Sequence, residues 1–296
     1  MTERHVKVST DRFRIRPDRR LHLRRFDPAE TSPFGSKAEA LDRMAEDLDR
    51  LSTLQELLYA ENRFAALVVL QGMDASGKDS AVKHVMSGMN PQGTNVVSFK
   101  APSTEELDHN FLWRIGRALP ARGHIGVFNR SHYEEVLVAR VHPEIFDRER
   151  LPADLVTKNI WHERFEDIRA FERHLTRNGT VVRKFFLHAS KDEQRQRFLK
   201  RLDDPAKNWK FSLADVRERD RWNDYMRAYE DMLAATSTDD APWYVVPADH
   251  KWFAHLLIAQ VIVETLQSLD LAWPKPTPAQ QRELAAARRQ LGGKRR

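Results

Sequence analysis

Residues 67–82 read LVVLQGMDASGKDSAV and contain the pattern G-x-x-x-x-G-K, whose chemistry is the binding of phosphate. Gly72 and Gly77 permit backbone torsions that turn successive N–H groups toward an anion, and Lys78 adds a positive point charge. An apolar segment precedes this loop and a helix-forming segment follows it, as such a loop requires. We predict that Lys78 is catalytic and that the loop binds phosphate through Gly72, Ala75, Ser76 and Gly77.

The loop departs from the usual pattern at the residue after the lysine. A Ser or Thr hydroxyl normally stands there and holds magnesium, whereas this chain has Asp79. A carboxylate beside phosphate is repelled by it. Either a cation lies between the two groups, or the carboxylate points away from the phosphate. We count Asp79 with the phosphate loop and interpret it as a first-turn carboxylate that favours the helix dipole. Asp74, inside the loop, is better placed to hold a metal on phosphate oxygens and is predicted to be catalytic.

A second cluster, VFNRSHYEEV, follows another apolar segment. A strand in this position commonly ends in an acid that holds magnesium, but here it ends in Asn129, so the negative charge must come from elsewhere. Glu134 and Glu135 lie one turn further and are predicted to be catalytic metal ligands, the alternative being a solvated helix surface. Arg130 is placed to reach a transferring phosphoryl group.

A third cluster, KDEQRQRFLKRLDDPAKNWKF, is strongly basic. Arg197, Lys200 and Arg201 follow the i, i+3, i+4 spacing that places them on one helix face. A solvated face is the alternative, but the position after the fourth predicted strand favours a lid that closes over phosphates, at about residues 197–233. We predict that Arg197 is catalytic and that phosphate is bound also by Arg195, Lys200, Arg201, Lys207 and Lys210.

Short apolar segments alternate with amphipathic segments along the chain, which predicts alternating strands and helices. The predicted strands are residues 64–70, 95–99, 125–128, 181–187 and 243–246. The predicted helices are residues 36–63, 77 onward, 103–118, a helix through 136 and 138, 157–176, 190–202, 211–233 and 250–269. This alternation is typical of an α/β protein whose parallel sheet has helices on both faces.

The chain has no Cys, which excludes disulfides, zinc–thiolate sites and thiol nucleophiles. No apolar run approaches a membrane span and the first residues lack the apolar core of a signal peptide, so we expect a cytoplasmic protein with no membrane partner.

The basic charge lies at the two ends of the chain. Residues 1–26 carry 9 Lys/Arg and 3 Asp/Glu, and residues 275–296 carry 7 and 1. Because the whole chain carries +6 and each end carries +6, the residues between them carry −6. We predict a basic arm (1–26) that forms an edge strand or an ordered wrap, a single phosphotransferase domain (27–274) and a basic, mobile tail (275–296). Such ends suggest an anionic polymer or surface as partner, or serve only solubility.

Four motifs resemble, in this order, the polyphosphate kinase 2 family: GMDASGKDS, FNRSHYEEVLVARVH, FFLHASKDEQRQRFLKRLDDPAKNWKF and APWYVVPADHKW. The resemblance implies a three-layer α/β/α P-loop kinase fold of the thymidylate-kinase type, with a five-stranded parallel sheet and a helical lid. It also implies direct, reversible, in-line transfer of the terminal phosphoryl group of inorganic polyphosphate to a nucleotide, with Mg²⁺ or Mn²⁺.

The resemblance extends to residue roles. Asp74 and Lys78 are similar to the family's metal-and-phosphate pair, and Arg197 is similar to a lid cation. Asn129, where many members have Asp, is similar to the branch that accepts AMP as well as ADP. We therefore expect AMP or ADP as acceptor, with GMP and GDP as further candidates, a homodimer or homotetramer, and no specific nucleic acid.

Two other functions are compatible with these features. An ATP-dependent nucleotide kinase would use the same loop but would need a pocket for the donor's adenine, for which the sequence shows no separate signature. A non-enzymatic polyanion-binding protein would use the basic ends and would not depend on the loop.

Overall fold

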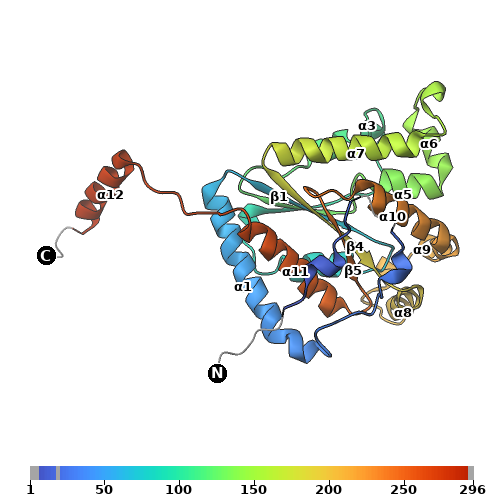
Figure 1. Cartoon of the computed structure of the whole chain (residues 1–296), viewed down its shortest axis with the longest axis horizontal. Coiled ribbons are helices and arrows are strands. Elements are labelled where there is room, and N and C mark those ends of the chain that lie inside the picture. The colour runs from blue at the N-terminus through green and yellow to red at the C-terminus, as the bar shows by residue number, and fades with distance from the viewer. Residues whose placement is uncertain (1–6, 18–20, 293–296) are drawn as a thin grey trace.

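Five parallel strands form the central sheet (Figure 1). The structure, a computed structural model of the chain, describes residues 7–17 and 21–292. The strands are β1 (Ala65–Gln71), β2 (Thr94–Ser98), β3 (Ile125–Asn129), β4 (Thr180–His188) and β5 (Trp243–Pro247), in the spatial order β2-β3-β1-β4-β5. All neighbouring strands pair in parallel, so their carboxyl ends meet at one edge of the sheet. The predicted α/β fold with a five-stranded parallel sheet is confirmed.

Helices cover both faces of the sheet, and this explains why β1 is a continuous apolar run that is buried along its whole length. One face carries α1 (Lys37–Glu61), α2 (Lys78–Val85) and α11 (Lys251–Gln267). The other face carries α5 (Glu134–Val141), α7 (Ile160–Arg177) and α10 (Trp222–Thr236). Each layer of helices closes its own hydrophobic core against the sheet.

The remaining helices lie in the connections. They are α3 (Thr104–Leu107), α4 (Trp113–Arg117), α6 (Phe146–Glu149), α8 (Lys191–Leu202), α9 (Leu213–Glu218) and α12 (Pro278–Leu291). Short 3-10 turns are η1 (Thr10–Phe13), η2 (Leu23–Arg25), η3 (Pro91–Gly93), η4 (Pro143–Ile145), η5 (Ala153–Leu155), η6 (Asn208–Lys210) and η7 (Arg219–Arg221).

Two helices predicted as continuous are broken in the structure. Residues 103–118 form α3 and α4, separated by a turn. Residues 211–233 form α9, η7 and the start of α10. The second break separates different environments, because α9 buries none of its residues whereas α10 buries an apolar face in the core shared with α5 and α7.

The basic arm is an ordered wrap rather than a free extension. Val8, Phe13 and Ile15 are buried, and the N–H of Ile15 donates to the carbonyl oxygen of Trp243 at 2.9 Å. Arg14 forms an isolated antiparallel bridge with Tyr244, so the arm covers the outer edge of β5. Residues 1–6 and 18–20 of the predicted arm lie outside the described residues.

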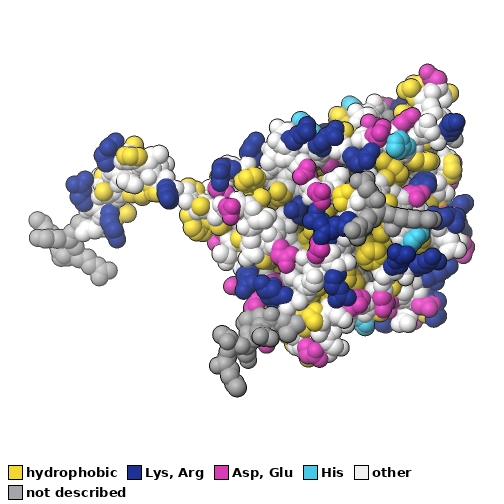
Figure 2. Space-filling model, in the orientation of Figure 1, with side chains coloured by type: hydrophobic (Ala, Val, Ile, Leu, Met, Phe, Trp, Pro, Cys, Tyr) yellow, Lys and Arg dark blue, Asp and Glu magenta, His cyan; other side chains and the backbone are white. Residues whose placement is uncertain are grey.

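The predicted tail contains helix α12, which stands clear of the body and buries none of its residues (Figures 1 and 2). Its predicted mobility stays a prediction, and residues 293–296 lie outside the described part of the chain. Among the described residues, no helix is both long enough and apolar enough to cross a membrane.

Candidate active site

The loop between β1 and α2 packs closely against β4. Gly72 has a φ of 151°, and a Cβ atom there would lie 2.8 Å from the carbonyl oxygen of Leu187, so only glycine fits. Gly77, directly before α2, has a φ of 114°. Ala75 also has a positive φ, 62°, a strained conformation for a residue with a side chain and one that occurs preferentially at functional sites. The sequence-predicted loop therefore has a tightly constrained backbone.

Lys78 lies against this loop and is buried. Its Nζ atom donates hydrogen bonds to the carbonyl oxygens of Gly72 (2.6 Å) and Met73 (3.1 Å). Burial, together with the positive charge of Arg130, lowers the pKa of Lys78 to about 8. The loop thus holds a desolvated ammonium group. A bound anion such as phosphate would stabilise its charged form.

Arg130 joins the two motifs that the sequence analysis treats separately. It follows β3 with a φ of 64°, and its guanidinium forms ion pairs with Asp74 of the loop and, at 3.2 Å, with Glu134 of α5. Burial opposes the charged form, but the two carboxylates outweigh it and raise the pKa of Arg130. Three of the predicted catalytic residues are therefore in direct contact.

Glu135, although adjacent to Glu134, has a different partner. It is buried and forms an ion pair with Arg114 at 3.0 Å, and burial raises its pKa. Among the described residues, no three acidic or His side chains gather in a metal-holding group. The predicted set of three metal ligands stays a prediction: Asp74 and Glu134 share Arg130, whereas Glu135, which also lines the cavity, pairs with Arg114.

Asp79 explains the unusual ending of both motifs. The amide of Asn129 donates a hydrogen bond to Asp79 Oδ1 at 2.8 Å, and Lys210 Nζ lies 3.4 Å from Asp79 Oδ2. Burial opposes ionisation, but the Asn129 hydrogen bond and the Lys210 charge together lower the pKa of Asp79. The acid and the amide are thus a matched pair that links α2, the end of β3 and η6.

Arg197 has structural contacts in addition to its place in the cavity wall. Its side chain is buried, and its guanidinium donates to the carbonyl oxygens of Ala75 (2.9 Å), Ser76 (2.8 Å), Ala248 (2.5 Å) and Asp249 (3.1 Å). Through these four backbone acceptors Arg197 ties the phosphate loop to the segment after β5. Its predicted catalytic role stays a prediction.

A cavity of about 1150 Å³ lies along the carboxyl edge of the sheet. On the β4 and β5 side it is lined by cations, which include the predicted Lys200, Arg201, Lys207 and Lys210 together with Lys251 of α11. The predicted Arg195 is exposed and is not in the lining, because it lies two residues from the inward-facing Arg197 on α8. Arg197, Lys200 and Arg201, which helical spacing predicts to share one face, all line the cavity.

On the β2 and β3 side the same cavity has apolar and charged side chains in its wall. The apolar ones include Phe99, Pro102, Leu107, Phe111, Val138 and Ile145. Arg114, Glu106, Lys100 and Arg148 also line this side, and Arg114 is anchored by the Lys100 carbonyl oxygen at 2.8 Å. We call this side the apolar half, because it holds most of the apolar lining, and the side with Lys200 and Lys207 the cationic half. Lys78 and Arg130 follow the central strands β1 and β3.

A buried network lies behind the second motif. Lys184 of β4 is fully buried and donates to the Tyr133 hydroxyl (2.9 Å), to the Thr236 carbonyl oxygen (2.8 Å) and to the carboxylate of Glu172. The Tyr133 hydroxyl also donates to Glu172 at 2.7 Å. Since Tyr133 directly precedes α5, this network sets the position from which Glu134 reaches Arg130.

A family model described as polyphosphate kinase 2 matches residues 35–272. The chain belongs to the polyphosphate kinase 2 family. The family resemblance that the four sequence motifs predict is confirmed.

Members of the polyphosphate kinase 2 family resemble the chain over nearly its whole length. It is 52% identical over 288 residues to a Rhodopseudomonas palustris protein named ADP-polyphosphate phosphotransferase, a match that covers 97% of this chain and 99% of that protein. It is 46% identical over 272 residues to a Meiothermus ruber protein named AMP/ADP-polyphosphate phosphotransferase, covering 92% of this chain and 98% of that one. The crystal structure of polyphosphate kinase 2 from Arthrobacter aurescens TC1 superposes with a TM-score of 0.85 at 40% identity, covering 95% and 97% of the two chains.

Sequence reasoning missed the apolar half of the cavity and the buried network. Phe99 and Phe111 belong to segments predicted only as a strand and a helix, and nothing in their spacing distinguishes a cavity wall from core packing. Lys184, inside the apolar strand segment VVRKFFL, did carry a signal, because a lysine there must find a buried partner.

Proposed function

We propose that this chain transfers the terminal phosphoryl group of inorganic polyphosphate to AMP or ADP, with GMP and GDP as further candidate acceptors. The names of the R. palustris and M. ruber relatives support this proposal. So does the phosphate loop, which is built from the residues that bind phosphate in other proteins with this motif.

The observation that carries the proposal is the asymmetry of the cavity. A nucleotide needs an apolar surface for its base, and a polyphosphate chain needs cations along its length. The apolar half, with Phe99 and Phe111, suits the base of the acceptor, and the cationic half, with Lys200, Lys207 and Lys251, suits the donor.

In the proposed reaction, an oxygen of the acceptor phosphate attacks the terminal phosphorus of polyphosphate. The bond from that phosphorus to the bridging oxygen breaks, and polyphosphate leaves one unit shorter. The transition state of such transfers is loose, so catalysis consists mainly of alignment and charge neutralisation. Lys78 and Arg130 supply fixed positive charge at the meeting point of the two halves.

A divalent ion fits the carboxylates at this point. Mg²⁺ is commonly held by one or two carboxylates together with substrate phosphates, and Asp74 and Glu134 line the cavity as such a pair. When bound, Mg²⁺ or Mn²⁺ supplies charge neutralisation between two phosphate chains that repel one another. Arg130 forms ion pairs with both carboxylates and thereby holds them close to each other.

The direct test is an assay with ADP, Mg²⁺ and long-chain polyphosphate, followed by the same assay with AMP, GMP and GDP. We expect ATP from ADP in the absence of any other phosphoryl donor. If the protein instead phosphorylates AMP or dTMP only when ATP is added, it is an ATP-dependent kinase, and the proposal is wrong.

A pair of variants on α8 tests the assignment of the two halves. Lys200→Gln removes a cation from the cavity wall, and we expect the KM for polyphosphate to rise several-fold while the KM for ADP stays the same. Arg195→Gln removes a cation from the outer face of the same helix and should change neither value. Equal effects of the two substitutions would contradict the assignment.

A further inference from the structure

A carboxylate, Glu106, lines the apolar half of the cavity beside Leu107. It lies on the short helix α3, which begins with a capping box in which the Ser103 N–H donates to Glu106 Oε2 at 2.7 Å. The other oxygen, Oε1, has no hydrogen-bond partner in the part of the chain that the structure describes, and the side chain is 28% exposed. The apolar half therefore contains an oxygen that is free to accept a hydrogen bond from a ligand.

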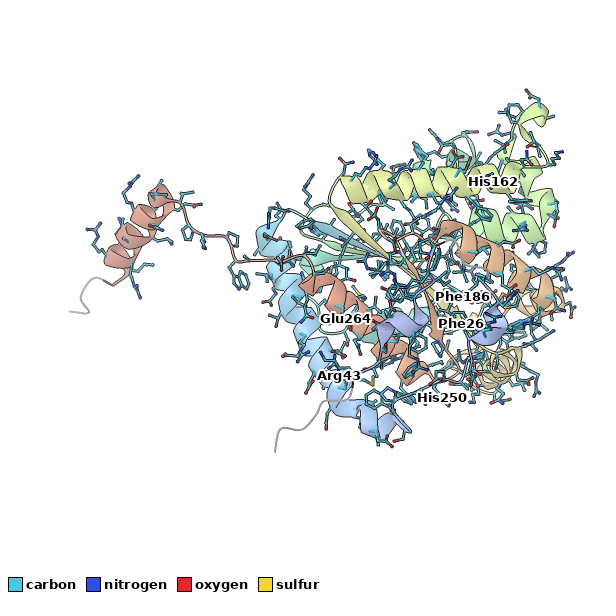
Figure 3. The ribbon with its side chains drawn as sticks, viewed as in Figure 1. Phe26, Arg43, His162, Phe186, His250 and Glu264 are labelled. Atoms are coloured by element: carbon cyan, nitrogen blue, oxygen red, sulfur yellow. The ribbon has the colours of Figure 1, made fainter. Side chains whose placement is uncertain are left out.

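Glu106 belongs to the same wall as the aromatic ring of Phe99. Arg114 connects the two, since its Nη1 atom lies 3.7 Å from Glu106 Oε2 and its guanidinium lies 5.4 Å from the centre of the Phe99 ring. Figure 1 shows α3 on the side of the molecule away from His250, which Figure 3 labels and which directly precedes Lys251 of the cationic half. Glu106 is therefore close to the surface that suits a base and remote from the end of the cavity at Lys251.

The guanidinium of Arg114 already has partners within the protein. Arg114 is buried, its Nη1 atom donates to the Lys100 carbonyl oxygen at 2.8 Å, and its Nη2 atom donates to Glu135 at 3.0 Å. The side chains of Lys100 and Arg148, also on this side, are exposed, so water weakens their interaction with a ligand. On this wall, Glu106 Oε1 thus offers a ligand an acceptor without a competing partner.

The purine bases of candidate acceptors differ at position 6, where adenine carries an amino group and guanine and hypoxanthine carry a carbonyl oxygen. An amino group donates to a carboxylate, and hydrogen bonds to a charged group are stronger than those between neutral groups. A carbonyl oxygen at the same place would face a negative charge and would lack a donor, which leaves a polar group of the bound base unpaired.

We propose that Glu106 selects the acceptor's base by accepting a hydrogen bond at Oε1 from the 6-amino group of adenine. This inference rests on the proposed function, which places the base in the apolar half. It makes AMP and ADP the preferred acceptors and makes GMP, GDP and inosine monophosphate (IMP) poor ones.

Glu106→Gln tests the selection, because glutamine keeps the capping box of α3 and its amide presents a donor as well as an acceptor. For the wild type with polyphosphate as donor, we expect kcat/KM to be about 10- to 100-fold higher for AMP than for IMP, as a hydrogen bond to a charged group typically provides. In Glu106→Gln the ratio should fall to within a few-fold, because the amide donates to the carbonyl oxygen of IMP.

Glu105→Gln is the matched control. Glu105 precedes Glu106 on α3, is 70% exposed, lies 3.7 Å from Arg117 and is not in the cavity lining. The substitution makes the same change of charge on the same helix, so it should leave the AMP-to-IMP ratio unchanged.

Equilibrium dialysis of AMP and IMP without polyphosphate separates this inference from the proposed function. We expect the wild type to bind AMP more tightly than IMP, and Glu106→Gln to lose most of the difference. If that result is obtained but no acceptor is phosphorylated from polyphosphate, the proposed function is wrong and the role of Glu106 stands.

Four results would overturn the inference and leave the proposed function intact. In the wild type, they are equal or tighter binding of IMP relative to AMP, and a preference for GMP over AMP, since the N1–H and amino group of guanine would then be the donors. In the variants, they are an unchanged AMP-to-IMP ratio in Glu106→Gln, and an equal change of the ratio in Glu105→Gln. The wild-type comparison needs no variant, so it decides the question even if Glu106→Gln does not fold.

Discussion

At the scale of single residues, the site uses an unusual division of charge. Asp79 stands where a hydroxyl commonly holds magnesium, and Asn129 stands where an acid commonly does. The two side chains bond to each other and, through Asp79, to Lys210 of η6. Both side chains therefore make contacts within the protein, and the carboxylates of the proposed cation site are Asp74 and Glu134.

Lys78 gives a prediction with a defined pH range. Its pKa of about 8 means that the free enzyme loses this positive charge as the pH rises through 8. We expect kcat/KM to fall above pH 8, whereas kcat should fall at a higher pH because bound phosphate stabilises the charged amine. Steady-state rates from pH 6 to 10 measure both, and Lys78→Arg, which keeps its charge, should lack the decline near pH 8.

Lys78→Ala should lower kcat/KM by on the order of 10² or more, as the loss of one preorganised charge contact typically does. An activity within a factor of a few of the wild type would remove Lys78 from the catalytic residues.

Arg197 gives a prediction about stability rather than binding. Arg197→Gln leaves carbonyl oxygens of the loop and of the segment after β5 without donors, and we expect a loss on the order of 3 kcal/mol in the free energy of unfolding. Urea unfolding without substrate measures it. Arg195→Gln, on the exposed face of the same helix, should stay within about 0.5 kcal/mol of the wild type. An unfolding midpoint for Arg197→Gln equal to that of the control would show that the tie to the loop is not structural.

At the scale of elements, the sequence predicts the features that come from local patterns. It does not predict side-chain contacts with segments that are distant in the sequence. The strands and the phosphate loop follow from apolar runs and a contiguous motif, and they are where the sequence places them. The fate of Arg197 depends on carbonyl oxygens from two distant loops, and that of Glu135 on the rotation of α5 against the sheet. No spacing within one helix contains that information, so the sequence does not predict these contacts within the protein.

The buried network behind α5 gives a prediction about stability. Lys184→Met removes the cation and leaves Glu172 as an uncompensated buried charge, so we expect a loss of about 3–5 kcal/mol in the free energy of unfolding. The double variant Lys184→Met with Glu172→Leu should recover much of this loss in denaturant titrations. If the double variant is no more stable than the single one, the pair is not the source of the effect.

At the scale of the whole molecule, the two basic ends have different roles despite their equal charge. The N-terminal arm places Val8, Phe13 and Ile15 in the cores, whereas α12 places no residue there. Charge alone could not distinguish them in the sequence. The local difference between them is that the arm alternates Arg with apolar residues at positions 12–16, and Phe13 and Ile15 of this stretch are buried.

Truncation should distinguish the contributions of the two basic ends to the free energy of unfolding. Deleting residues 1–17 exposes three buried apolar side chains, each worth about 1.5–3 kcal/mol, and should lower the free energy of unfolding by several kcal/mol. Deleting residues 279–296 should change it by less than about 0.5 kcal/mol at concentrations where the chains are apart. Thermal unfolding of both truncated proteins measures the difference, and an arm deletion as stable as the tail deletion would contradict the role of the arm.

The contact between the arm and α11 also has a consequence for how this protein is made. The Val8 N–H donates to the Gln260 side chain at 3.3 Å, and the Gln260 amide donates to the Val8 carbonyl oxygen at 2.6 Å, across 252 positions of sequence. The segment around Val8 therefore leaves the ribosome 252 residues before its partner on α11 and cannot take its final position until that helix has been made. During that interval its apolar residues are exposed to other nascent chains and to chaperones.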